Sequence, residues 1–136
     1  MRLSGEEEIY PGIYGHTIMT LISVDIEGRG RAAFQLDDRN PGLAQALLRV
    51  LPISTPAERW QEEIYFSLPF ACEDENPSIS AQRGDVSYWS PGPAFCIFFG
   101  DSQPISAVNH LGSIVEGLDA VARARQGDVI TLSVAP

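Results

Sequence analysis

Lysine is missing from the sequence: all nine basic residues of this 136-residue chain are arginines. Without lysine the chain has no Schiff-base or lysine-nucleophile chemistry. The 18 acidic residues give a net charge of −9, whereas nucleic-acid binding needs a clustered basic surface. The one local basic grouping, Arg29, Arg31 and Arg39, is interrupted by Asp37 and Asp38. We therefore expect no nucleic-acid partner.

Cysteine and histidine are also scarce, with two of each. Cys72 and Cys96 stand in apolar neighbourhoods and outside any C-x-x-C motif, so both are interpreted as free, buried thiols. His16 and His110 are far apart and lack a companion ligand at the spacing that a metal site uses. No phosphate loop or dinucleotide fingerprint occurs. The sequence predicts neither a metal nor a cofactor.

Long apolar runs are absent as well, since none approaches the ~20 residues of a membrane-spanning helix. The chain opens on an acidic segment rather than on the basic start of a signal peptide. We expect a cytoplasmic protein with no membrane partner. The remaining composition, 44% hydrophobic and 20% charged, is typical of a folded domain.

Short alternating segments make up most of the chain. Between residues 17 and 26, Ile22, Val24 and Ile26 recur with a period of two, which predicts a strand with one buried face. Turn signals separate similar segments, and the predicted strands span residues 17–26, 31–36, 62–69, 70–75, 85–90, 94–99, 110–116 and 128–134. The sequence thus predicts one mainly β domain over residues 17–136, with residues 1–16 as a loose arm or an edge strand.

One helix is predicted from Asn40 to Leu51. Asn40 is expected at the N-cap, Pro41 at the first helical position, and Pro52 just beyond the end. Its apolar residues recur at helical spacing. So short a helix suits a plug over the mouth of a barrel. A second, shorter helical turn is predicted around residues 118–125.

Residues 86–100 carry no charge, although the chain as a whole is acidic. A Pro-Gly-Pro turn divides this stretch into two strands, and the second is apolar at every position from Ala94 to Phe99. A strand of this kind is covered on both faces. We therefore predict a central hairpin in which Cys96 and Phe98 are inaccessible to solvent.

Three segments resemble the signature blocks of a small prokaryotic cyclophilin-like family of unknown function. They read ERWQEEIYFSLP (residues 58–69), GDVSYWSPGPAFCIFFG (84–100) and PISAVNHLGSIV (104–115). The likeness extends from about residue 34 to 134. It implies a closed, eight-stranded cyclophilin-like β-barrel with a helix capping one end. The strand pattern by itself fits a barrel or a sandwich equally well.

The family name does not bring an activity with it. True cyclophilins are peptidyl-prolyl isomerases that place an arginine beside the prolyl nitrogen in a Phe-His-Arg setting, with a Gln-Gly-Gly-Asp segment soon after. Here Arg59 is the only arginine in the matching segment, Trp60 follows it, and Gln-Gly-Gly-Asp is missing. This departure favours a barrel without catalysis over a weak isomerase that uses Arg59.

Arg59, Trp60, Tyr65 and Trp89 are the predicted binding residues. Aromatic side chains on the barrel wall would form a groove for a peptide or a small molecule, and the net charge of −9 favours neutral or basic ligands. In the purely structural alternative, Arg59 pairs with a glutamate of the same segment, Glu62 or Glu63, and Trp60 packs at the barrel rim. Whether the barrel forms a homodimer is left open by the sequence.

Overall fold

The computed structural model describes residues 20–136, so the predicted arm of residues 1–16 lies outside the described residues. Two helices and nine strands occur in this part of the chain. In chain order they are β2 (Leu21–Ile26), β3 (Gly30–Leu36), α1 (Pro41–Val50), β4 (Ile53–Pro56), β5 (Glu58–Trp60), β6 (Glu63–Ser67), β7 (Asp85–Trp89), β8 (Ala94–Phe98), β9 (Asn109–Glu116), α2 (Leu118–Arg123) and β10 (Val129–Val134).

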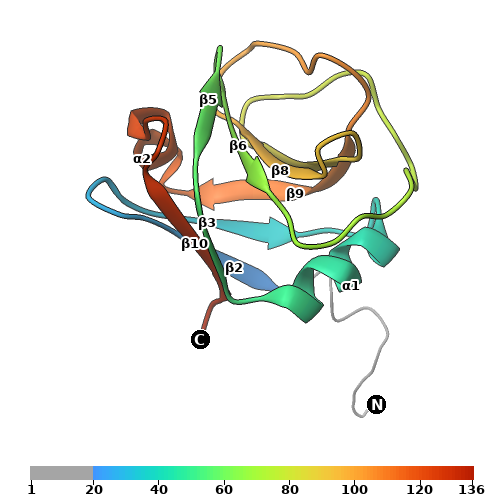
Figure 1. Cartoon of the computed structure of the whole chain (residues 1–136), viewed down its shortest axis with the longest axis horizontal. Coiled ribbons are helices and arrows are strands. Elements are labelled where there is room, and N and C mark those ends of the chain that lie inside the picture. Colours follow the sequence, from blue (N-terminus) through green and yellow to red (C-terminus); the bar gives the residue numbers. More distant parts are fainter. Residues whose placement is uncertain (1–19) are drawn as a thin grey trace.

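The strands form one antiparallel sheet that curls into a nearly closed barrel (Figure 1). The order across the sheet is β4-β10-β2-β3-β9-β7-β8-β6-β5. Its two ends, β4 and β5, are consecutive pieces of one segment that Ala57 joins. Ala57 is fully buried, and its backbone bonds to the loop before β10: its N–H donates to the Asp128 carbonyl (2.8 Å), and its carbonyl accepts from the Gly127 N–H (2.7 Å). Residues 53–60 thus close the barrel, and the predicted fold class is confirmed.

The predicted strand count was one too low. Seven of the eight predicted strands are present, but residues 70–75 form no strand and β4 and β5 were missed. The missed segment contains Pro56, which sheets tolerate at an edge. In the mispredicted segment a side chain takes the place of a strand partner. The Tyr88 hydroxyl accepts from the Cys72 N–H (2.7 Å) and donates to the Cys72 carbonyl (3.0 Å).

Alternate residues of the strands fill the barrel. The predicted inward residues Ile22, Val24 and Ile26 are completely or almost completely buried. At the centre, the Phe95 ring lies 5.4 Å from that of Phe34 and 5.2 Å from that of Phe66, measured between centroids. The apolar residues that recur with a period of two along the strands therefore form a continuous apolar core.

Helix α1 packs Leu43, Ala44 and Leu47 against the barrel core, and α2 lies on the opposite side (Figure 1). The helix begins at Pro41 as predicted, but the Asn40 side chain does not cap it.

A distant carboxylate takes over the capping role at α1. Glu75 accepts from the N–H groups of Gly42 (3.1 Å) and Leu43 (3.0 Å), which satisfies two donors at the positive end of the helix. The Asn40 amide instead donates to the His110 carbonyl (2.8 Å). The cap therefore ties the loop after β6 to the start of α1.

Strand β8 is buried along its whole length, as predicted. Phe95 and Ile97 face the barrel core. The alternate residues Cys96 and Phe98 point outward, yet they are 1% and 0% exposed because they belong to a second apolar cluster with Ala81 and Val108. This second cluster lies on the outside of the barrel wall and carries the candidate site.

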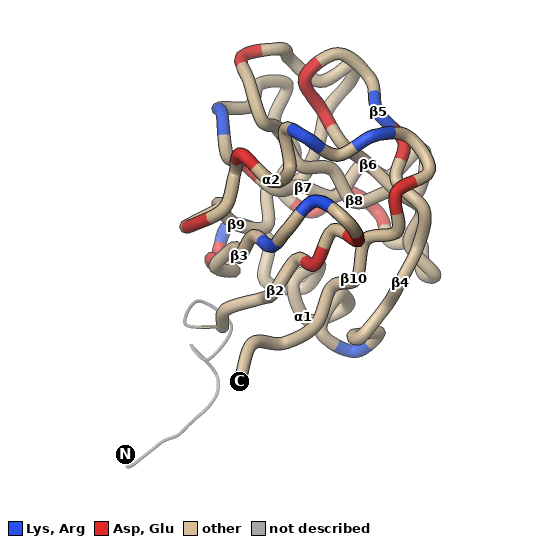
Figure 2. The backbone as a smooth tube through the Cα atoms, turned by 90° about the vertical axis from the view of Figure 1, so that its left-hand side faces the viewer, with Lys and Arg blue, Asp and Glu red and all other residues tan. Residues whose placement is uncertain are grey.

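Charged residues are mixed rather than segregated. Figure 2 shows aspartates and glutamates interspersed with the arginines around α2 and β5. No helix among residues 20–136 is long and apolar enough to cross a membrane.

Candidate ligand-binding pocket on the barrel wall

Three outward-facing aromatic residues lie around one pocket. Trp60 on β5 is the cross-strand partner of Glu63 on β6, and Tyr65 is the next outward residue of β6. Trp89 on β7 lies on the same outer face, two strands away. Residues of a covering loop complete the pocket, which encloses about 150 Å³ and is lined by Trp60, Glu63, Tyr65, Trp89, Pro104, Ile105 and Val108. We call it the aromatic pocket.

Residues 99–108, here the roof loop, cover the outer face at the pocket. Glu62 holds the first part of this loop: its Oε1 accepts from the N–H groups of Asp101 (2.8 Å) and Ser102 (3.1 Å), and its carbonyl accepts from the Phe99 N–H (2.9 Å). The fit is so close that a Cβ atom at Gly100 would overlap the Glu62 carboxylate. A larger residue at position 100 would therefore push the Glu62 carboxylate away from the N–H groups that it accepts from.

The second part of the roof loop is held by Trp89 on β7 and by Ser78 in the segment before β7. The Trp89 indole N–H donates to the Ser106 hydroxyl (2.8 Å). Val108 forms a two-way backbone bridge with Ser78 (2.8 and 2.9 Å). Since the roof loop is bonded at both ends, the pocket is formed before any ligand arrives.

Glu63 is the one charged side chain among the described residues that line the pocket. It is 8% exposed, and this burial raises its pKa, an effect that a hydrogen bond from the Cys96 thiol partly opposes. Burial, together with the neighbouring Glu63 carboxylate, raises the pKa of Cys96 well above its ordinary value, so the thiol stays protonated. None of the ion pairs formed within residues 20–136 involves Glu63.

Arg59 lies apart from the aromatic pocket. Its cross-strand partner is the inward-facing Ile64, so Arg59 and Trp60 point to opposite faces of β5. The guanidinium Nη1 donates to the carbonyls of Ala122 (3.0 Å) and Ala124 (2.7 Å), at the C-terminal end of α2. Its Cζ also lies 4.6 Å from the centroid of the Phe99 ring.

The structure therefore divides the four predicted residues: it brings together Trp60, Tyr65 and Trp89 and leaves out Arg59. The alternative that paired Arg59 with Glu62 or Glu63 named the wrong partner. A cation at the carbonyl end of a helix is the stabilising arrangement that the structure has instead.

Comparison with known proteins agrees with this architecture. The family model described as cyclophilin-like matches residues 20–133. The chain belongs to the cyclophilin-like family. No curated protein matches the sequence.

Two solved structures share the cyclophilin-like barrel. The hypothetical protein AF2241 from Archaeoglobus fulgidus, known from its solution structure, is 30% identical with a TM-score of 0.78; the match covers 90% of this chain and all of that one. The structure of McbB in complex with tryptophan is 16% identical with a TM-score of 0.70. It matches over 82% of this chain but only 44% of McbB, so it supports the fold alone.

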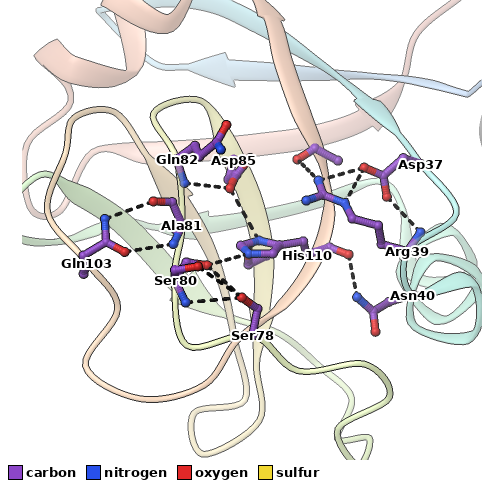
Figure 3. A network of polar contacts seen from close by, with 12 residues as sticks. Asp37, Arg39, Asn40, Ser78, Ser80, Ala81, Gln82, Asp85, Gln103 and His110 are labelled. Carbon is purple, nitrogen blue, oxygen red and sulfur yellow. Dashed lines mark hydrogen bonds and ion pairs between the residues drawn. The ribbon is translucent and has the colours of Figure 1, made fainter.

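A second group of polar residues lies on the same outer face of the cyclophilin-like barrel (Figure 3). The Ser87 hydroxyl is 2.7 Å from His110 Nδ1, and Asp85 Oδ2 is 3.7 Å from the same nitrogen. His110 Nε2 lies 2.8 Å from the Ser80 carbonyl. A carbonyl can only accept, so Nε2 carries the proton and Nδ1 accepts from Ser87. We call Asp85, Ser87 and His110 the polar cluster.

The polar cluster has the residue types of a hydrolase triad, but a substrate cannot reach its serine. Ser87 is completely buried, so no substrate carbonyl can reach its hydroxyl. Asp85 Oδ2 accepts from the Gln82 N–H (2.8 Å), as Figure 3 shows. The cluster joins β7 and β9 to the loop before β7.

A polar hollow of about 230 Å³ lies beside it, lined by Arg39, Ser78, Ser80, Ala81, Gln82, Asp85 and His110.

No group of three or more His, Cys, Asp and Glu side chains within residues 20–136 is arranged to hold a metal ion. Sequence reasoning passed over four residues of the pocket, Pro104, Ile105, Val108 and Glu63. The outward direction of Glu63 follows from the strand pattern, but its burial does not. The one available signal was the apolar sequence of residues 104–108, which is unusual for an exposed loop.

Proposed function

We propose that this cyclophilin-like barrel is a binding module that takes a small molecule, or one side chain of a peptide, into the aromatic pocket without making or breaking a bond. The observation that carries the proposal is an apolar pocket with a bonded roof on the outside of the barrel. Its volume of about 150 Å³ matches that of an apolar cavity that accommodates benzene.

The rim of the pocket supports the same interpretation. Trp60 is 37% exposed and Ile105 is 73% exposed. Large apolar side chains that gather at the mouth of a concave site are typical of binding surfaces. Aromatic residues in such positions contribute much of the binding energy.

Isomerase activity through Arg59 is the weaker alternative. To donate to a prolyl nitrogen, the guanidinium would have to give up the carbonyls of Ala122 and Ala124 and its contact with Phe99. It would also have to act on the opposite face of β5 from the pocket. We therefore assign no catalytic step to this barrel.

The chain contains a built-in probe for the proposal, because both of its tryptophans, Trp60 and Trp89, line the pocket. Small neutral, cationic and anionic compounds and short peptides should be titrated while tryptophan emission is recorded. Tryptophan itself, the ligand of the McbB structure, is tested by calorimetry. We expect at least one compound to change the emission saturably and to raise the melting temperature.

A matched pair of variants locates the binding. Ile105→Ala removes an apolar wall of the pocket, whereas Ile79→Ala removes an equally large side chain that is 83% exposed elsewhere. Affinity should fall in the first variant and stay at the wild-type level in the second. A complete absence of ligands in the screen, or equal losses in both variants, would overturn the proposed function.

A further inference from the structure

We infer that the group held in the aromatic pocket is a small organic ammonium ion, with the Glu63 carboxylate as its counter-ion and the pocket aromatics around it. The inference rests on the proposed function and specifies the chemical class of the ligand. Its basis is the combination of one buried carboxylate, three aromatic side chains and no cationic side chain among the described residues that line the pocket.

The first observation is the environment of Glu63. A glutamate is almost never this buried unless it is paired, because removing a carboxylate from water without a partner is costly. The Cys96 thiol donates to it, but a thiol is a weak donor. No ion pair within residues 20–136 includes Glu63. A cationic ligand would provide the charge that the described chain does not.

The second observation is what surrounds the carboxylate. Trp60 lies directly across from Glu63 in the β5–β6 pair, and Tyr65 and Trp89 line the same pocket. Aromatic faces attract cations, tryptophan most strongly, and aromatic cages of this kind bind quaternary ammonium groups. A plain hydrophobic pocket would not need the carboxylate, and a carboxylate site for a metal ion would not need the aromatics.

The third observation is that no arginine of residues 20–136 lines the pocket. The chain contains no lysine. The arginine adjacent to the pocket, Arg59, points to the other face of β5 and bonds to the end of α2. The net charge of −9 attracts cations and repels anions at long range.

The decisive experiment compares choline with 3,3-dimethyl-1-butanol. The two molecules have the same shape and differ in one atom, a positively charged nitrogen in place of a neutral carbon. Tryptophan emission reports the affinity of each. We expect choline to bind about ten-fold more tightly or better, as a partly desolvated cation–π and ion-pair contact gives. An N-acetylated, C-amidated lysine tests a primary ammonium group carried by an amino-acid side chain. If it also binds better than its neutral acetyl-lysine counterpart, peptides are a second source of the ammonium.

Glu63→Gln removes the negative charge and nearly preserves the side-chain shape. This variant should lose most of the preference for choline while it keeps its affinity for dimethylbutanol, which also shows that it is folded. Glu58→Gln is the matched control, because Glu58 is an exposed carboxylate on β5 that lies outside the pocket lining. If the two variants lose choline affinity equally, long-range charge explains the preference and the inference is wrong.

A second variant covers the case in which Glu63→Gln does not fold. Trp60→Leu keeps an apolar side chain on a short edge strand but removes the aromatic face, so it should weaken choline and spare dimethylbutanol. Equal affinity of the wild-type protein for choline and dimethylbutanol would overturn the inference and leave the proposed function standing. If no compound of either kind binds, the proposed function itself fails.

Discussion

The aromatic pocket and the polar cluster lie on the same outer face of the barrel, and both are covered by loops, yet they differ in how their polar atoms are satisfied. In the polar cluster the serine hydroxyl, both ring nitrogens of the histidine and the aspartate all have partners within the protein. In the aromatic pocket Glu63 lines the same space as three aromatic residues, and the Cys96 thiol is the one donor to its carboxylate found within residues 20–136.

This difference is the reason that we propose the aromatic pocket, and not the polar cluster, as the binding site. Residue types alone would favour the polar cluster, since serine, histidine and aspartate suggest hydrolysis. Each of its side chains, however, has a hydrogen-bond partner within the protein, and its serine is completely buried. The aromatic pocket contains less familiar chemistry but has room and an incompletely paired charge.

The largest expected effect is a loss of stability when the outer apolar cluster beneath the pocket is disrupted. Phe98→Ala should lower the free energy of unfolding by about 3–5 kcal/mol, because this completely buried ring lies in the cluster under the pocket. Urea denaturation measures the loss. Rapid labelling of Cys96 by a thiol reagent in the wild-type protein would contradict the assumed burial, since both side chains belong to the same cluster.

The next effect concerns the polar cluster. Ser87→Ala should cost about 1–3 kcal/mol, since it leaves the buried His110 Nδ1 without its donor. The affinity of the aromatic pocket for its ligands should not change. Parallel denaturation and binding measurements check both statements. Loss of binding with full retention of stability would mean that the polar cluster is functional.

Arg59→Ala should have a smaller effect, about 1 kcal/mol, because the lost bonds to Ala122 and Ala124 and the stacking on Phe99 are largely exposed. A protease-coupled assay on an Ala-Pro peptide should detect no robust isomerase turnover in the wild-type barrel. Strong turnover that disappears in Arg59→Ala would restore the isomerase alternative.

The smallest expected effect is the pH dependence that Glu63 contributes. Because burial raises its pKa, the folded protein keeps this proton to a higher pH than the unfolded chain does. Stability is therefore greatest below the ordinary pKa of 4.5 and declines as the pH rises through the raised folded value. Glutamine does not titrate. The free energy of unfolding of Glu63→Gln should therefore rise relative to that of the wild type as the pH increases from the ordinary to the raised pKa of Glu63.

Asp128 provides a control of opposite sign for the same measurement. Its hydrogen bond from Arg29 (2.8 Å) lowers its pKa. The stability from this pair is present above the ordinary pKa and is lost as the pH falls through the lowered value. The free energy of unfolding of Asp128→Asn should therefore decrease relative to that of the wild type as the pH rises through the lowered pKa of Asp128. Parallel pH profiles for the wild type and both variants would contradict these assignments.

The sequence could predict those features that depend on local alternation. A period of two places Tyr65 outward, and an uninterrupted apolar run marks β8 as covered on both faces. What it could not predict depends on segments distant in the chain. The roof loop completes the pocket around Glu63, α2 provides the partners of Arg59, and Glu75 caps α1.

The closure of the barrel at Ala57 has a consequence for circular permutation of the chain. Most barrels are held shut by two strands that pair side by side, but here β4 and β5 are successive parts of a single segment. Where β4 approaches β6 there is a cleft of about 320 Å³, lined by Ile53, Ser54, Thr55, Ser67, Leu68 and Pro69. The two ends of the sheet are therefore joined covalently, through Ala57. Circular permutation with new termini at Ala57 would turn the barrel into an open sheet whose two ends are free to separate, and Trp60 would move with one of them.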